Sequence, residues 1–436
     1  MPREAWPAAR PSTRLPTSRV ARRMPRGGPG GRSTSCPPRG RGPRPGRCTA
    51  RLRASSRAIS PATLRWEWVA IASPPWATRR TASRLSRGHP SGRSLLMAAD
   101  LLEVTDRGLY CAAGDFYVDP WRPVPRAVIT HAHADHARSG CDRYLCLATG
   151  KRVLRERVGR TAPIDGVRRG ETVVINGVSV SLFPSGHILG AAQIRIEHRG
   201  VRWVVTGDYK LEADPTCDPF EPVEADVLIT ESTFGLPVYR WGESGETALA
   251  VNAWWRENRE AGRSCVLLAY SLGKAQRLAA MLDPSIGPIY AHGAVMRMVR
   301  AYRESGVALP PIDQLDPATR RAGNGKAMVI APPSAAGTRW LKTFGETSVA
   351  MASGWMTVRG VRRRRGIGRG FVLSDHADFP GLLEAVDASR ARRVLVTHGQ
   401  SDIFARFLRD RGLDAEPLAT LFRGEDAGDA DEEAEP

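Results

Sequence analysis

The six residues 131–136, with the sequence His-Ala-His-Ala-Asp-His, constrain the fold of this chain more than any other stretch. They place three imidazoles and one carboxylate directly after the apolar run 127–130. That run predicts a buried strand, and α/β proteins hold their sites where such strands end. The stretch therefore predicts a ligand cluster at a sheet edge. Ligand groups this close in sequence cannot all reach one ion, which favours two metals.

Four further apolar runs end at or near a candidate ligand or proton carrier. They are 203–206 before Asp208, 227–230 before Glu231, 371–373 before His376, and 394–397 before His398. A separate stretch, residues 185–190, contains His187. Six of the nine histidines fall in these motifs, which disfavours the alternative of a chance His-rich surface loop. Imidazole and carboxylate ligands suit zinc, and carboxylates also suit manganese.

The formal net charge of +19 is concentrated at one end of the sequence. Residues 1–96 contain 21 Arg, no Lys and two acids without hydrophobic periodicity, so we predict that they are disordered. Three interpretations of this leader are open: a basic nucleic-acid-binding arm, a transit peptide, or translated upstream DNA before a native start at Met97. The absence of Lys favours the third. Residues 424–436 contain seven acids and predict a disordered tail.

The remaining composition indicates a cytoplasmic protein with a polyanionic substrate. The seven cysteines form no Cys-x-x-Cys pair, a distribution typical of reduced thiols. No run of 18 apolar residues occurs, so we expect no membrane span. Residues 97–423 have a modest basic excess, which suits a polyanion.

Residues 236–370 alternate between strand and helix patterns and predict an inserted α/β domain. Within this segment, a strand–turn–helix pattern places Lys274 and Arg277 near a helix start, where backbone amides can hold a phosphate. An arginine run that includes Arg362 and Arg363 comes shortly before His376. We predict that these four cations bind the substrate; solvated surface charges are the alternative.

The metal motifs, taken in order, resemble those of the metallo-β-lactamase fold over residues 97–423. Three later motifs resemble those of its β-CASP branch, which consists of nucleases acting on DNA or RNA. They are Glu231-Ser-Thr, Ser374-Asp-His376 and Thr397-His398-Gly. Residues 114–120, 353–356 and 370–378 further resemble the bacterial ligase-associated DNA exonucleases, which are also labelled mRNA 3′-end processing factors.

The resemblance implies an α/β fold, a metallo-β-lactamase αββα sandwich with an inserted β-CASP α/β domain. We expect the sandwich to comprise residues 97–235 and 371–423, and the insertion to comprise residues 236–370. The leader 1–96 and the tail 424–436 would flank this fold.

The resemblance also implies a role for each motif residue. One metal would be held by His131, His133 and His187, and the other by Asp135, His136 and His398. Asp208 would bridge the two metals, and Asp119 would orient the ligand loop. The expected catalytic residues are Asp135, His376 and Glu231. His376 would protonate the expelled oxygen, and Glu231 would fix its orientation.

The function implied by the resemblance is a DNA exonuclease of repair or ligation with two divalent metals, zinc ahead of manganese. An ATP-dependent DNA ligase and a helicase are partners implied in the same way. His398 resembles the RNA-processing members at this motif, so an RNA 3′-end processing ribonuclease is the alternative. A glyoxalase II-like thioesterase would not need the insertion, and a non-catalytic relative typically loses ligands, so both are lesser alternatives.

Overall fold

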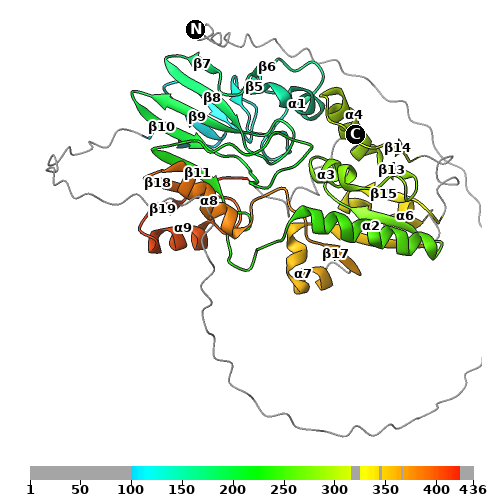
Figure 1. Ribbon diagram of the computed structural model, residues 1–436. Helices are drawn as coiled ribbons and strands as arrows, with labels where there is room; N and C mark the ends of the chain where they lie inside the picture. The colour runs from blue at the N-terminus through cyan, green and yellow to red at the C-terminus, as the bar shows by residue number, and fades with distance from the viewer. Residues whose placement is uncertain (1–99, 316–324, 343–345, 365–366, 423–436) are drawn as a thin grey trace, which may run out of the picture. The chain divides into compact units, whose positions relative to one another are not determined.

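The computed structural model describes residues 100–315, 325–342, 346–364 and 367–422. Within these ranges it contains one seven-stranded and two six-stranded sheets, together with helices (Figure 1). The α/β class predicted from the sequence is confirmed. The predicted leader 1–96 and tail 424–436 lie outside the described residues, and the proposed domain boundaries stay predictions.

The first sheet contains six strands in sequence order. They are β1 (Glu103–Val104), β2 (Leu109–Cys111), β3 (Phe116–Val118), β4 (Ala127–Val128), β5 (Tyr144–Leu147) and β6 (Ile164–Val167). Strands β3 to β6 pair in parallel. The predicted strand at 127–130 contributes two residues to this ladder, and the Ile129 amide continues it by donating to the Leu145 carbonyl. The ligand stretch therefore begins where β4 leaves the sheet.

The second sheet has the order β19-β18-β11-β10-β9-β8-β7. Its strands are β7 (Thr172–Ile175), β8 (Val178–Pro184), β9 (Ala192–His198), β10 (Val201–Val205), β11 (Val227–Glu231), β18 (Arg393–Thr397) and β19 (Asp414–Pro417). Strands β10, β11 and β18 are parallel neighbours. Their carboxyl ends meet at one edge, which brings Asp208, Glu231 and His398 together.

Two hairpins lie in this sheet. Strands β7 and β8 turn at Asn176 and Gly177, and β9 and β10 turn at Arg199 and Gly200. All four turn residues have a positive φ, between 47° and 81°. Such two-residue turns match the twist of the flanking strands, and Asn and Gly favour the positive φ that they require.

The third sheet is entirely parallel, in the order β14-β13-β15-β12-β16-β17. Its strands are β12 (Ser264–Leu268), β13 (Ile289–Ala291), β14 (Asp313–Gln314), β15 (Met328–Ala331), β16 (Thr347–Ala352) and β17 (Arg369–Phe371). Helices α2 (Ser244–Glu260), α3 (Lys274–Met281), α4 (Gly293–Glu304), α6 (Arg339–Lys342) and α7 (Arg359–Arg364) alternate with them. Strands β12 and β15 are buried along their whole length, as expected for a sheet covered on both faces.

One expectation near residue 370 needs correction. The strand predicted at 371–373 lies at Arg369–Phe371 and pairs with β16, so it belongs to the third sheet. His376 therefore follows a strand of this sheet by five positions. Local propensity did not reveal this outcome, because parallel pairing with β16 depends on distant residues. The arginine run begins inside helix α7.

The hydrophobic clusters relate the sheets to their helices. One cluster contains core residues of both the first and the second sheet, including Val128 and Ile194. A second cluster joins the second sheet to α8 (Phe379–Ser389) and α9 (Ser401–Asp410), through Leu382 and Phe404. A third joins α1 (Lys151–Val158) to α4, through Leu154 and Tyr302. The ligand loop after β4 lies within this third cluster and is therefore built on a packed base.

Two compositional expectations concern the described part of the chain. No helix within it is long and apolar enough to cross a membrane. The cysteines that the structure describes carry free thiols. They are Cys111, Cys141, Cys146, Cys217 and Cys265.

Candidate metal centre

The seven side chains expected as metal ligands lie in two groups. The first group is His131, His133, His187 and Asp208, and the second is Asp135, His136 and His398. Within each group, one ligand atom per residue lies within 4.8 Å of the others. The groups adjoin at Asp208, whose Oδ2 lies 3.3 Å from His131 Nε2 and 3.8 Å from His136 Nε2. Strand exits far apart in sequence thus converge on one small volume.

Asp119 holds the beginning of the ligand loop. Its Oδ1 accepts a hydrogen bond of 2.8 Å from the Thr130 amide, and its Oδ2 accepts one of 2.8 Å from His136 Nδ1. Because Nδ1 is occupied in this way, His136 turns its Nε2 toward the second group. Asp119 is buried and has a φ of 43°, a conformation that residues other than glycine rarely adopt. These contacts support the orienting role inferred for Asp119.

Two backbone carbonyls from distant segments fix the rings of the first group. His133 Nε2 lies 3.2 Å from the carbonyl oxygen of Leu272, and His187 Nδ1 lies 2.8 Å from that of Asp375. A carbonyl only accepts, so each of these ring nitrogens must carry the proton. The opposite nitrogens, His133 Nδ1 and His187 Nε2, lie 3.1 Å apart and are left with their lone pairs. This outer contact is the usual way in which proteins orient ligand histidines.

The second group is closed on one side by Phe422. Its ring stacks on His136 at 4.6 Å and on His398 at 4.8 Å between centroids, with interplanar angles of 5° and 8°. His398 has a φ of 58°, and its carbonyl oxygen accepts a hydrogen bond from the Ser232 hydroxyl. The strained backbone turns His398 Nε2 to within 3.2 Å of His136 Nε2.

Burial controls the charge of these histidines. It lowers the pKa of His131 to about 3 and that of His398 to about 4. Neutral imidazoles are the form that binds metals. His136 differs, because burial alone would lower its pKa while neighbouring carboxylates, led by Asp135, raise it to about 10. The second group would therefore release a proton when it binds a cation.

The donor set fits divalent metals. Oδ1 of Asp208 is buried and has no hydrogen-bond partner among the described residues. Burial alone would raise the pKa of Asp208, but neighbouring histidines, led by His136, hold it well below its ordinary value. A buried, ionised carboxylate with a free oxygen beside converging imidazole nitrogens is costly unless a cation completes it.

Glu231 and His376 form a dyad beside this centre. His376 Nδ1 donates to Glu231 Oε2 at 2.8 Å, and Glu231 Oε1 accepts from the Tyr209 amide at 2.8 Å. The Thr233 hydroxyl also donates to Glu231, so the carboxylate is fixed by three donors. Ligand-type atoms of Asp208, Glu231 and His376 lie within 4.8 Å of one another. The dyad is therefore close enough to act on a group held at Asp208.

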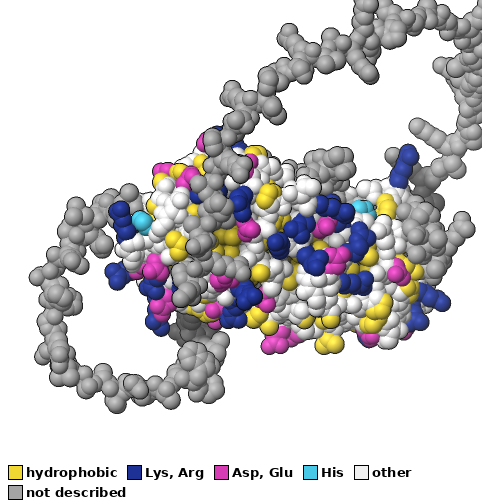
Figure 2. All heavy atoms as spheres, turned by 90° about the horizontal axis from the view of Figure 1, so that it is seen from above, with side chains coloured by type: hydrophobic (Ala, Val, Ile, Leu, Met, Phe, Trp, Pro, Cys, Tyr) yellow, Lys and Arg dark blue, Asp and Glu magenta, His cyan; other side chains and the backbone are white. Residues whose placement is uncertain are grey.

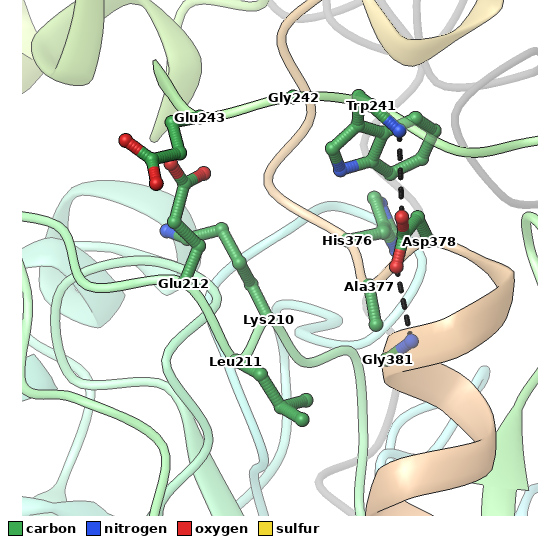
Figure 3. Close-up of a pocket in the computed structure, with 10 residues that line it drawn as sticks. All are labelled: Lys210, Leu211, Glu212, Trp241, Gly242, Glu243, His376, Ala377, Asp378 and Gly381. Carbon is green, nitrogen blue, oxygen red and sulfur yellow. Dashed lines mark hydrogen bonds between the residues drawn. The ribbon is translucent and has the colours of Figure 1, made fainter. Parts of the chain in front are cut away.

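A pocket of about 290 Å³ opens beside His376 (Figure 3). Three segments line it, and each follows or includes a site residue. They are Lys210–Glu212 after Asp208, Trp241–Glu243 after Glu231, and the stretch from His376 to Gly381 at the start of α8. In the close-up, Trp241 and His376 lie on one side of the space, and Glu212 and Glu243 lie on the other.

Comparison with known proteins gives relatives for most of the described chain. No protein-family model matches it. A probable DNA ligase of Opitutus terrae is 33% identical over 310 residues, which is 71% of this chain and 30% of that protein. Cleavage and polyadenylation specificity factor subunit 3 of Dictyostelium discoideum is 36% identical over 28% of this chain. The endoribonuclease YSH1 of Saccharomyces cerevisiae is also 36% identical, over the same share.

This chain is a relative of the β-CASP nucleases of the metallo-β-lactamase fold. It spans 30% of the length of the Opitutus relative, 16% of the Dictyostelium relative and 15% of the yeast relative. The family named from the sequence motifs is confirmed. The relatives named as endoribonucleases are hydrolases of phosphodiester bonds, the enzyme class expected for this chain.

Two of the four cations expected at the substrate are buried among protein groups. Arg277 is fully buried among Glu212, Asp214 and Asp375, at 2.5, 3.5 and 3.6 Å. Lys274 is also buried, with its Nζ 4.8 Å from the centre of the Tyr270 ring. A phosphate would have to displace these partners, so burial disfavours substrate contact by Lys274 and Arg277, which stays a prediction.

The other two cations come from α7. Arg363 is exposed, whereas the side chain of Arg362 lies outside the described residues. Substrate contact by Arg362 and Arg363 stays a prediction.

Several contacts of the β-CASP site were missed by sequence reasoning. Phe422 lies a few residues before the acidic tail and has no motif around it. The Leu272 contribution is a backbone carbonyl, which any residue type would supply. Ser232 offered the one usable signal, because a hydroxyl beside Glu231 at a strand exit can fix a neighbouring loop.

Proposed function

We propose that this chain is a dinuclear-metal phosphodiesterase that cleaves nucleic acid. The observation that carries the proposal is the convergence of the two ligand groups on Asp208, with the Glu231–His376 dyad beside it. The architecture that we propose for it is the αββα sandwich with the β-CASP insertion.

We propose that His131, His133 and His187 hold one divalent metal, and that Asp135, His136 and His398 hold the other. Asp208 would contact both. When bound, two such metals lower the pKa of water toward neutrality and neutralise charge on a phosphodiester. Imidazole-rich ligands favour zinc, and the carboxylates of Asp135 and Asp208 make manganese the second choice.

His376 is proposed as the acid that protonates the expelled oxygen. The hydrogen bond from its Nδ1 to Glu231 leaves Nε2 as the atom that can pass a proton to substrate. Burial raises the pKa of Glu231, while His376 opposes that shift. Through this hydrogen bond, Glu231 would orient the imidazole.

The proposed substrate is DNA, cut by an exonuclease that works in repair or ligation. The Opitutus relative named as a probable DNA ligase supports this choice. RNA 3′-end processing is the second candidate, supported by the relatives named as endoribonucleases and by His398. An ATP-dependent DNA ligase and a helicase as partners, and a cytoplasmic location, stay predictions.

The surface also suits a polyanion. Figure 2 shows Lys and Arg side chains gathered on one face of the molecule. Helices α1 and α4 and the residues after α1 form a groove in which arginines outnumber glutamates. The arginines are Arg152, Arg155, Arg160, Arg297 and Arg300, and the acids are Glu156 and Glu304. Only Arg152 of these arginines forms an ion pair within the described part of the chain, with Glu304 at 2.9 Å.

The test uses the full chain loaded with zinc or with manganese, on end-labelled single strands of DNA and RNA of one sequence. Stepwise shortening of DNA at the higher rate is the expected result, and the labelled end gives the polarity. Faster cleavage of RNA would favour the RNA-processing alternative. A metal-loaded protein that cleaves neither strand would overturn the proposal and favour the thioesterase.

A further inference from the structure

The pocket beside His376 lies outside the two ligand groups and adjoins the dyad only at His376. It adjoins the residue proposed to protonate the leaving group, so it lies on the leaving side of the scissile phosphate. Its volume of about 290 Å³ is at the lower end of small-molecule sites. It therefore suits one compact group and not a duplex.

The charges around the pocket disfavour a phosphate as its occupant. Lys210, the one Lys or Arg among the described lining residues, is buried and donates to Asp214 at 2.9 Å. Glu212, Glu243 and Asp378 contribute three carboxylates. Burial alone would raise the pKa of Glu212, but hydrogen bonding by Ser244 and the charge of Arg277 hold it below its ordinary value. Glu212 accepts from Ser244 and Arg277, and Asp378 accepts from Trp241 and Gly381. The exposed Glu243 is therefore the carboxylate best placed to accept a hydrogen bond from a ligand.

The opposite wall is aromatic and held in place. The Trp241 ring lies 4.9 Å from the Phe234 ring in an edge-on arrangement with an interplanar angle of 88°. The Trp241 amide donates to Asp378 Oδ2 at 3.4 Å, and the Gly381 amide donates to Asp378 Oδ1 at 3.0 Å (Figure 3). Asp378 therefore ties the tryptophan segment to the beginning of α8. Trp241 itself is half-buried and faces the pocket with the remainder of its side chain.

We propose that this pocket receives the nucleobase of the nucleotide on the leaving side of the scissile phosphate. Stacking on Trp241 would supply the affinity, since every base has a π-face. The Glu243 carboxylate opposite would accept a hydrogen bond from an exocyclic amino group. Adenine, cytosine and guanine carry such a group, whereas thymine and uracil do not. This inference rests on the proposed function and makes Trp241 a specificity residue for it.

The experiment scans one abasic site along a labelled strand and measures the rate of each cut, with product lengths giving the cut positions. In the wild-type protein, an abasic site immediately on the leaving side slows cleavage by about tenfold or more. In Trp241→Ala, the intact and abasic strands are cut at equal rates. Trp241→Phe keeps a ring and keeps the difference. Trp340→Ala, which removes a half-buried tryptophan beside His292, behaves as wild type.

A second set of strands carries each of the four bases at the leaving position. The strand with thymine at the leaving position is cleaved about two- to tenfold more slowly than the strand with cytosine there, which is the range expected for one hydrogen bond. Glu243→Gln, which replaces an acceptor oxygen by a donor, narrows that difference without changing the abasic effect. Circular dichroism and metal content check that Trp241→Ala remains folded and loaded; Trp241→Leu repeats the test with the apolar volume retained.

Two results would overturn the inference while the nuclease function stands. One is a wild-type rate that does not depend on the base at the leaving position. The other is an abasic effect that persists undiminished in Trp241→Ala and Trp241→Leu. Absence of cleavage on every strand would instead overturn the proposed function and this inference with it.

Discussion

Arg277 of helix α3 donates a hydrogen bond of 2.6 Å to the carbonyl oxygen of Ser374, which lies 97 positions later and two residues before His376. The same guanidinium lies among the carboxylates of Glu212, Asp214 and Asp375. The backbone carbonyl of Asp375 in turn fixes the ring of His187. One buried cation thus holds the loop that carries the proposed acid and orients a proposed ligand.

Replacing Arg277 by Met should therefore destabilise the protein and misplace that loop. It leaves buried carboxylates without their cation, which costs about 3–5 kcal/mol. Thermal unfolding measures the loss. The matched control is Arg256→Met, which removes an exposed pair with Asp283 and should cost about 1 kcal/mol or less. Equal melting temperatures for the two variants would contradict the bridging role of Arg277.

The proposed bridging role of Asp208 predicts that metal and activity are lost together. Asp208→Asn replaces a charged oxygen that both ligand groups face. Metal content after dialysis should fall by about one ion or more per chain, and strand cleavage should fall with it. Glu224→Gln, an exposed carboxylate paired with Arg390, is the control. Retention of both metals in Asp208→Asn would contradict the proposal that Asp208 contacts both of them.

His376→Ala should separate chemistry from metal binding. Loss of a general acid lowers the cleavage rate by about 10²- to 10⁴-fold, while the metal content remains that of wild type. Glu231→Gln keeps the shape of the orienting side chain and should give a smaller loss. Because ligand-type atoms of His376 and Asp208 lie close together, an emptied metal site in His376→Ala would identify His376 as a ligand instead.

Phe422→Ala should weaken the second ligand group without affecting the first. The phenyl ring stacks on His136 and His398 and contacts no histidine of the first group among the described ring pairs. Loss of an outer contact of this kind lowers metal affinity by about 10- to 100-fold. Titration with a competing chelator should then resolve one weakened and one unchanged metal. Uniform weakening of both would show that Phe422 acts on the whole site.

The ion cluster around Asp214 predicts a dependence of stability on pH. Burial alone would raise the pKa of Asp214, but Lys210 and Arg277 bring it below the ordinary value. A carboxyl whose pKa is lower when folded stabilises the protein above its unfolded pKa of about 4. That stability is lost as the pH falls through the folded value. In metal-free protein, the melting temperature should fall from pH 5 to pH 3, and less steeply in Asp214→Asn.

The sequence by itself determined the ligand types, the local turns and most of the elements around the site. The histidines of the 131–136 stretch could be predicted as metal ligands, because the ability of an imidazole to bind a metal depends on the residue type and not on the fold. The Asn176-Gly177 hairpin follows from a backbone conformation that these residues favour. Strands β10, β11 and β18 of the second sheet were predicted because each contains an apolar run followed by a polar residue.

Only the tertiary structure decided which groups these residues meet. A cation near a helix start, such as Arg277, has the same sequence signal whether it faces solvent or buried carboxylates, and here it is buried. Strand β17 joined the third sheet because its partner β16 lies there. The carbonyl of Leu272 reaches His133 across 139 positions, and Phe422 covers His136. Such contacts depend on which residues lie close together in space, and the local pattern of a sequence does not contain that information.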